Sequence, residues 1–236
     1  MKIYAIRYAE HFKYATKGSV FRNTPDAAER IEDFAFFYYL AEVDDKYYLV
    51  DTGFRDEELA EKMGVHIFPM GEVEQVFGKM PQIDTVIITH SHWDHINNLD
   101  LYPEASVVMA KKAYEIARET GTDAVKERLM GGNLTLVEDE CWIADKFLFQ
   151  LIGGHTPVSS VVFFEEAGKK YVITGDECYQ RENVIRNIPI GLTSDAEKNE
   201  KFIASIHEQD IIPLPFHDAS ILEKYTRLSE NIVQII

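Results

Sequence analysis

The sequence predicts an α/β protein in which two packed sheets are flanked by helices within a single domain, residues 1–236. Short apolar or alternating runs of strand length recur along the chain, and helical patterns lie between them. With 236 residues, of which 46% are hydrophobic, the chain can bury a sizeable core. No repeat period or low-complexity linker divides it. This mixture disfavours a helix bundle and an all-β sandwich.

The expected strands share an apolar pattern and are bounded by Gly, Asp or Asn. They cover residues 2–8, 34–43, 46–53, 84–90, 105–110, 133–139, 146–154, 160–166, 170–176 and 210–217. A short polar turn separates the second of these strands from the third, and the eighth from the ninth. Both pairs are therefore expected to form antiparallel hairpins.

The expected helices have apolar residues at helical spacing. They cover residues 55–63, 71–80, 111–120, 194–209 and 220–230, with Ser194 as the N-cap of the fourth. Two segments, 9–33 and 121–132, show no clear period, and irregular segments of this length often contact ligands. In the first segment Phe12, Tyr14 and Phe21 could line a pocket for an acyl chain, or could close the edge of the core.

The charge of the chain limits its partners. Its 24 basic and 40 acidic side chains give a formal net charge of -16, which would repel a phosphate backbone, so no nucleic acid is expected. The first residues lack the long uncharged run of a secretory signal, and no run is long enough to span a bilayer, which predicts a cytoplasmic protein without membrane contact. Cys141 and Cys178 are too few for a disulfide framework or a Cys-rich zinc site.

Five of the predicted strands deliver a His or an Asp just after their last apolar residue. These residues are Asp51, His90, His155, Asp176 and His217. Side chains in this position converge on one edge of a sheet, so a single cluster is expected. The motif HSHWDH, residues 90–95, adds His92, Asp94 and His95 to it.

Histidine nitrogens and carboxylate oxygens in this number suit a divalent metal, with zinc expected first and iron or manganese as alternatives. Within HSHWDH, His90 and His92 can share one ion while Asp94 and His95 face a second. Asp176 has two oxygens and is the expected bridge between ions roughly 3.5–4 Å apart. Taken singly, each residue has an ordinary explanation, such as Asp94 capping a helix. Taken together, they favour a metal site.

These motifs, in this order, resemble the metallo-β-lactamase superfamily. HSHWDH fits its H-x-H-x-D-H signature, and GGHTP, TGDE and the final histidine follow as in that family. The resemblance implies a four-layer αβ/βα sandwich with two metal ions at one edge between the sheets. It assigns His90, His92 and His155 to the first ion, Asp94, His95 and His217 to the second, Asp176 to both, and Asp51 to a position behind a ligand.

Within that superfamily the sequence looks most like the N-acyl-homoserine-lactone lactonases. Tyr179 lies three positions after Asp176, where a tyrosine of those enzymes contacts the lactone. The match is incomplete, because Val158 and Ser159 replace the Gly and His that usually continue the GH motif, and INN replaces a glycine pair after DH. These departures leave the ligands intact and affect the shape of the pocket near His155.

The resemblance implies a dinuclear hydrolase that opens a lactone, in which water bridging the metals loses a proton and attacks the ester carbonyl carbon. We expect Tyr179 to stabilise the oxyanion, Asp94 to carry a proton to the leaving alkoxide, and Asp51 to orient a ligand histidine. Two alternatives remain: a thioesterase similar to hydroxyacylglutathione hydrolases, which have an additional C-terminal helical region, and a metal-binding module without activity. The expected partner is a small ester or lactone, and a homodimer is left open.

Overall fold

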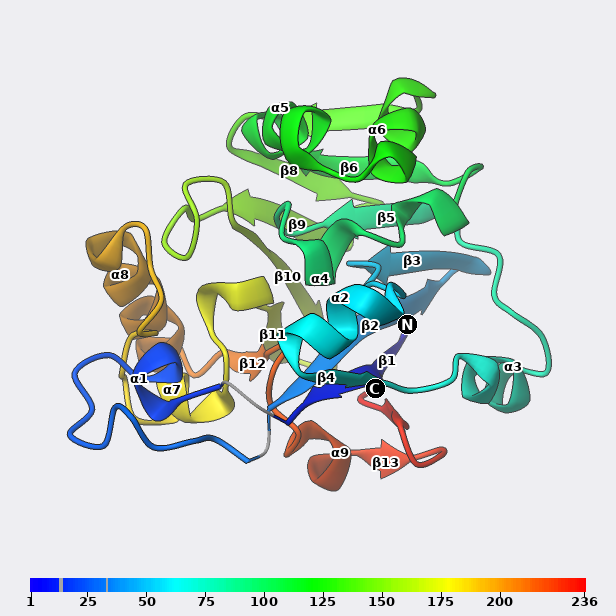
Figure 1. The fold of residues 1–236 in the computed structure, drawn as a ribbon. Helices are drawn as coiled ribbons and strands as arrows, with labels where there is room; N and C mark the ends of the chain where they lie inside the picture. The colour runs from blue at the N-terminus through cyan, green and yellow to red at the C-terminus, as the bar shows by residue number, and fades with distance from the viewer. Residues whose placement is uncertain (13–14, 33) are drawn as a thin grey trace.

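Two β-sheets pack face to face, with helices outside each, in the computed structural model of the chain (Figure 1). The structure describes residues 1–12, 15–32 and 34–236. Its four layers form an αβ/βα sandwich, so the fold class predicted from the sequence is confirmed.

The first sheet has the strand order β13-β14-β1-β2-β3-β5-β6-β7 over the described residues, with β4 also paired to β1. Its strands are β1 (Lys2–His11), β2 (Ala35–Val43), β3 (Lys46–Val50), β4 (Val65–Ile67), β5 (Thr85–Ile88), β6 (Ser106–Ala110), β7 (Leu134–Val137), β13 (Thr226–Arg227) and β14 (Ile232–Gln234). Neighbouring strands from β3 to β7 in this order are parallel. The carboxyl ends of β3 and β5 therefore meet at the same edge.

The second sheet has the order β12-β11-β10-β9-β8. Its strands are β8 (Glu140–Ile143), β9 (Phe147–Leu151), β10 (Ser160–Glu166), β11 (Lys169–Ile173) and β12 (Ile212–Leu214). The two predicted hairpins are confirmed, because β2 pairs antiparallel with β3 and β10 with β11. Asp44 and Asp45, which join β2 to β3, have φ values of 50° and 62°, the left-handed backbone that a tight hairpin turn requires.

The side chains of β10 alternate between two separate apolar clusters, one on each face of the second sheet. Val162 and Phe164 face the large apolar cluster between the sheets, whereas Val161 faces a smaller cluster with Phe202 and Ile203 of α8. Successive side chains of a strand point to opposite faces, so this strand is apolar on both sides. The second sheet is thereby fixed between the first sheet and a helix.

The helices lie outside the two sheets, except α4, which is buried near the centre of the view (Figure 1). They are α1 (Lys17–Val20), α2 (Glu57–Met63), α3 (Gly71–Phe77), α4 (Trp93–Ile96), α5 (Lys111–Thr120), α6 (Asp123–Met130), α7 (Arg181–Ile185), α8 (Ala196–Glu208) and α9 (Ile221–Lys224), with short 3₁₀ turns η1 (Leu99–Leu101) and η2 (Gly175–Glu177). Among the described residues, no helix is both long and apolar enough to cross a membrane.

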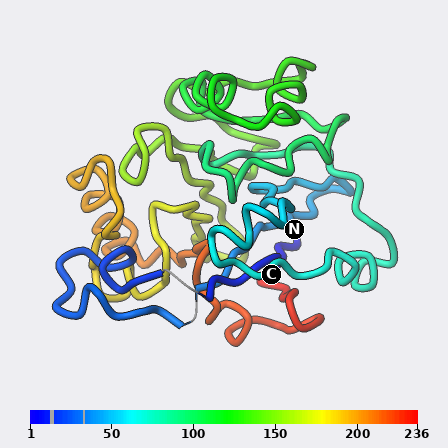
Figure 2. The backbone as a smooth tube through the Cα atoms, in the orientation of Figure 1, coloured from blue at the N-terminus to red at the C-terminus, as the bar shows by residue number. Residues whose placement is uncertain are grey.

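Residues 16–22, which include α1, lie against α7 and the loop 188–195 that follows it (Figure 2). The amide of Leu192 donates to the carbonyl of Ser19, with an N to O distance of 3.1 Å. A side chain on Gly191 would meet the carbonyl oxygen of Gly18 at 1.8 Å, so glycine is required where the two segments cross. The loop 188–195, which this contact holds, reaches the candidate metal ligand His155.

Three predictions about helices were wrong. The N-cap of α8 is Asp195 rather than Ser194, because it is the Asp195 carboxylate that accepts from the amide of Lys198. Segment 121–132 is not irregular, since it contains α6, which Thr122 caps. The helix expected over 220–230 ends at Lys224, because the following residues pair with β14 instead.

Candidate metal centre

The seven predicted metal ligands come together where strands of both sheets end. His90 follows β5, and Asp94 and His95 lie on α4 immediately after it. From the second sheet, His155 follows β9 and Asp176 lies in η2 after β11. His217 follows β12. Their nitrogen and oxygen atoms form two groups, each with its ligand atoms within 4.8 Å of one another.

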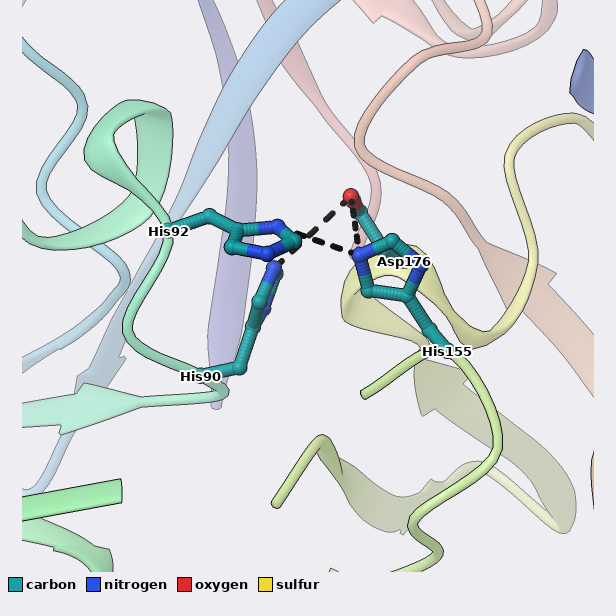
Figure 3. Close-up of side chains that lie close together, drawn as sticks. All are labelled: His90, His92, His155 and Asp176. Atoms are coloured by element: carbon teal, nitrogen blue, oxygen red, sulfur yellow. Dashed lines mark hydrogen bonds and ion pairs between the residues drawn. The ribbon is translucent and has the colours of Figure 1, made fainter. Parts of the chain in front are cut away.

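The first group contains His90, His92, His155 and Asp176 (Figure 3). The Nε2 atom of His155 lies 3.3 Å from Asp176 Oδ2 and 3.1 Å from His92 Nδ1. The Nε2 atom of His90 lies 3.8 Å from the same carboxylate oxygen. Of these four residues only His92 is exposed, so this group opens to solvent on the side of His92.

The second group contains Asp94, His95 and His217, all of them buried. Asp176 faces this group with its other oxygen: Oδ1 lies 3.1 Å from His95 Nε2 and 3.0 Å from His217 Nε2. Asp94 Oδ2 lies 3.6 Å from His95 Nε2. The Asp176 carboxylate thus lies between the two groups, with Oδ2 facing the first and Oδ1 facing the second.

The donor set fits divalent cations. Within the described part of the chain, the buried Nε2 atoms of His90 and His95 have no hydrogen-bond partner, and each lies at ion-pair distance from Asp176. Buried polar atoms are rarely left unpaired, and each of these two points into one of the groups. Imidazole nitrogen and carboxylate oxygen are the usual ligands of zinc and of related first-row ions. A cation in each group would satisfy both nitrogens.

Asp51 lies behind the second group, where its carboxylate contacts the far side of a ligand histidine. Its Oδ2 is 2.5 Å from His95 Nδ1, and the amide and hydroxyl of Thr89 both donate to the carboxylate at 2.7 Å. The pair of Asp51 and Thr89 joins the ends of β3 and β5. A proton on Nδ1 leaves Nε2 of His95 free to bind a metal.

Backbone carbonyls orient two other ligands in the same way. His217 Nδ1 lies 2.9 Å from the carbonyl of Ala35, and His155 Nδ1 lies 3.1 Å from the carbonyl of Leu192. Each contact places the Nδ1 proton on the carbonyl side and turns Nε2 towards Asp176. The loop 188–195, held by residues 16–22, therefore aligns the candidate ligand His155.

The charges of the centre are strongly coupled. Burial lowers the pKa of His95, but the carboxylates of Asp176, Asp94 and Asp51 outweigh it and raise the pKa well above its usual value. Burial raises the pKa of Asp176, yet His95 and other nearby histidines lower it well below the usual range. Burial, with His95 beside it, lowers the pKa of His90. The metal-free centre therefore holds positive charge on His95 and negative charge on Asp176.

The sequence matches the model of the metallo-beta-lactamase superfamily over residues 33–229. The chain belongs to the metallo-beta-lactamase superfamily. Among proteins with curated descriptions, none matched it.

Solved structures of metallo-beta-lactamase fold resemble it over nearly their full length. A quorum-quenching N-acyl homoserine lactone lactonase is 20% identical, with 98% of each chain covered and a TM-score of 0.77. A mutant of AiiA from B. thuringiensis, with N-decanoyl-L-homoserine bound at the active site, is 20% identical over 96% of each chain, with a TM-score of 0.75. A probable metal-dependent hydrolase from Staphylococcus aureus is 17% identical, covers 92% of this chain and 88% of its own, and has a TM-score of 0.76. At these identities the likeness establishes the fold.

Tyr179 is buried beside both groups of this metallo-beta-lactamase centre. Its hydroxyl lies 3.3 Å from His155 Nδ1, and its ring centroid lies 5.4 Å from that of His217. Burial, together with Asp176 and other nearby carboxylates, raises the pKa of the Tyr179 phenol well above its usual value. The phenol therefore keeps its proton and can donate a hydrogen bond at neutral pH.

The aromatic residues expected to contact substrate have mixed placements. Phe12 is 49% exposed, and Phe21 packs on a small apolar cluster that includes Tyr179. Tyr14 lies outside the described residues. Two aromatic residues that the sequence did not single out lie closer to the ligands. Phe34 stacks on the ring of His217 at 4.3 Å, and Phe36 meets it edge-on at 4.8 Å.

Sequence reasoning also missed Glu177, the residue directly after Asp176. Its side chain is fully buried and accepts hydrogen bonds from the amides of Gly154 and His155 at 2.8 and 2.9 Å. The departure from the usual GH motif was the available signal, because Ser159 contacts the same carboxylate.

Proposed function

We propose that this chain is a dinuclear metal-dependent hydrolase of a small ester, and that its substrate is a lactone of the acyl-homoserine type. The observation that carries the proposal is the position of Asp176, whose two oxygens face two separate groups of ligand atoms. Three histidines complete the first group, and Asp94 with two histidines completes the second. The lactone assignment is supported by the likeness to lactonases and by Tyr179.

The residues that would hold the ions are those of the two groups. Two divalent cations in this position would lower the pKa of bound water and polarise an ester carbonyl. Hydrolysis adds the oxygen of water to the carbonyl carbon, breaks the bond from that carbon to the ring oxygen, and moves one proton to the leaving alkoxide. The product is an open-chain hydroxy acid, so atoms and charge balance.

The remaining steps fall to side chains of the protein. Tyr179 would donate a hydrogen bond from its hydroxyl to the oxygen of the reacting carbonyl, where negative charge develops. Asp94 Oδ2, at the boundary of the second group, would carry the proton of the attacking water to the alkoxide. Phe34 and Phe36 would place an apolar wall beside His217, suited to the carbon skeleton of the substrate.

The first experiment is metal analysis of the purified protein with a panel of substrates: a long and a short acyl-homoserine lactone, a simple γ-lactone and a glutathione thioester. Two metals per chain with turnover of the lactones would support the proposal. Turnover of the thioester alone would reassign the enzyme to thioester hydrolysis. A protein that binds metal without turning over any of the panel would count against lactonase activity, and one that binds no metal would overturn the whole proposal.

A further inference from the structure

The segment that carries His155 is held by a buried cluster that the reaction itself does not use. The cluster consists of Glu177 in η2, Asn199 in α8 and Ser159 in the loop after His155, all of them fully buried. No ion pair of Glu177 occurs within the part of the chain that the structure describes. Its carboxylate is thus stabilised by hydrogen bonds from neutral groups.

Every group that reaches the Glu177 carboxylate is a donor. Oε1 accepts from the amides of Gly154 and His155 and from the hydroxyl of Ser159, whose one proton can also go to the carbonyl of Thr156 at 2.9 Å. Oε2 accepts from Asn199 Nδ2 at 2.9 Å. A carboxylate is an acceptor at both oxygens, so it satisfies all four donors at once. An amide of the same shape cannot do so.

Asn199 connects this cluster to the other side of the same histidine. Its Nδ2 also donates to the backbone carbonyl of Glu177, and its Oδ1 accepts from the amide of Ile190 at 3.0 Å. Ile190 belongs to the loop 188–195, whose residue Leu192 accepts from His155 Nδ1. The two buried side chains therefore fix the backbone of His155 from one side and its ring from the other.

The packing at Gly154 shows how closely these parts fit. A Cβ atom at this position would lie 2.5 Å from Glu177 Oε2 and 2.8 Å from Asn199 Cβ. Such distances are well inside van der Waals contact, so the loop can approach the carboxylate only with glycine here. The amides of Gly154 and His155 are held in one place.

We infer that Glu177 and Asn199 are positioning residues that set the geometry of His155 and thereby the metal affinity of the first group. This inference rests on the proposed metal centre. Loss of an outer partner of a ligand lowers metal affinity by about 10- to 100-fold. The second group, whose histidines are held by Asp51 and by Ala35, should change much less.

Glu177→Gln is the first variant. A glutamine places an NH₂ group either against Asn199 Nδ2 or against the three donors at Oε1. We expect one of the two cobalt-binding steps of the metal-free full chain to weaken by about 10- to 100-fold. Stepwise Co²⁺ titration followed by visible absorption measures both steps, and the hyperfine-shifted Nδ1 proton of His155 should move.

Asn199→Asp is the second variant, which should partly compensate for Glu177→Gln when the two are combined. Alone it places two carboxylates together and should weaken the same step. In the double variant the glutamine NH₂ can donate to the new aspartate, but the backbone carbonyl of residue 177 still lacks its donor, so cobalt should bind more tightly than in either single variant and less tightly than in the unaltered chain. A merely destabilising pair would not recover in this way. Arg128→Met is the control, since Arg128 is buried in hydrogen bonds to Tyr102, Ala105 and Gly132 on another part of the fold and should affect stability only.

If Glu177→Gln does not fold, Ser159→Ala replaces it, with a loss of about two- to tenfold at the same step. Unchanged cobalt affinity in the folded Glu177→Gln protein, or in Ser159→Ala where that variant replaces it, would overturn the inference. A double variant that binds cobalt more weakly than both single variants would also overturn the inference. If the unaltered chain binds two cobalt ions, either result leaves the proposed function standing. A chain that takes up no cobalt would overturn the proposed function, and this inference with it.

Discussion

The two groups of ligand atoms are held in place by different means. In the second group, His95 is backed by Asp51, which together with Thr89 joins the ends of two neighbouring strands. In the first group, His155 lies on a loop, and its partners are a carbonyl of another loop and the buried carboxylate of Glu177. The position of His95 is therefore set by the sheet, and that of His155 by a buried hydrogen-bond cluster between loops.

The variant with the largest expected effect removes the residue that the two halves share. Asp176→Ala deletes both oxygens, so we expect loss of both ions and a fall in hydrolysis on the order of a thousandfold. Metal content per chain and turnover of a lactone measure this. Asp100→Ala is the control, because Asp100 pairs with Arg55 near the surface. Two metals and full activity in Asp176→Ala would contradict the dinuclear scheme.

Tyr179→Phe tests whether the tyrosine hydroxyl stabilises the reacting carbonyl oxygen or only positions His155 of the first group. The phenylalanine keeps the ring beside His217 and deletes the hydroxyl, so we expect kcat to fall by roughly 100-fold with two metals still bound. The hydroxyl also contacts His155. Metal loss from the first group, with unchanged kcat in the reloaded protein, would show that the hydroxyl acts only on this ligand.

Asp51→Asn should weaken the second group more than the first, which Asp51 reaches only through the contact of Thr89 with His90 Nδ1 at 3.1 Å. The carboxylate contacts His95 Nδ1 and accepts two hydrogen bonds from Thr89, and an amide cannot replace both oxygens as acceptors. We expect one metal dissociation constant to rise by about 10- to 100-fold while the other stays close to its original value. Competition with a chelator measures both constants. Equal weakening of the two would mean that the groups are not independently held.

The smallest expected effect concerns the order of metal release. His92 is exposed, whereas all ligands of the second group are buried. A chelator should therefore remove cobalt in two phases, the faster one from the first group, as followed by stopped-flow absorption. His92→Ala should accelerate only the faster phase and Asp51→Asn mainly the slower one. A single phase in the unaltered protein would contradict the difference between the groups.

The local part of the centre could be read from the sequence. HSHWDH follows an apolar strand directly, and the other ligands follow strands too, so their convergence was predictable from the ends of strands alone. The position of Asp51 was predictable for the same reason. Glu177 was not predicted, because its hydrogen-bond partners lie 18 to 23 positions away in the chain, and only the unusual Ser159 gave a signal for it.

The misjudged helices have a related cause. In α6 only Val125 and Leu129, four positions apart, give a helical spacing, together with the cap at Thr122. So short a signal is weak until the buried face is known. At the other end of the chain, Thr226 and Arg227 join β14 rather than continue α9. Pairing with a distant strand there decides the local structure.

The tight fit at Gly154 also has an evolutionary meaning. The glycine is required by the buried Glu177 and Asn199, which leave no space for a Cβ atom, and not by the metal chemistry. In homologous proteins that have a small residue in place of Glu177, selection on this glycine should relax. Positions 154, 177 and 199 should therefore vary together across the family, as one unit of inheritance, while the metal ligands beside them stay constant.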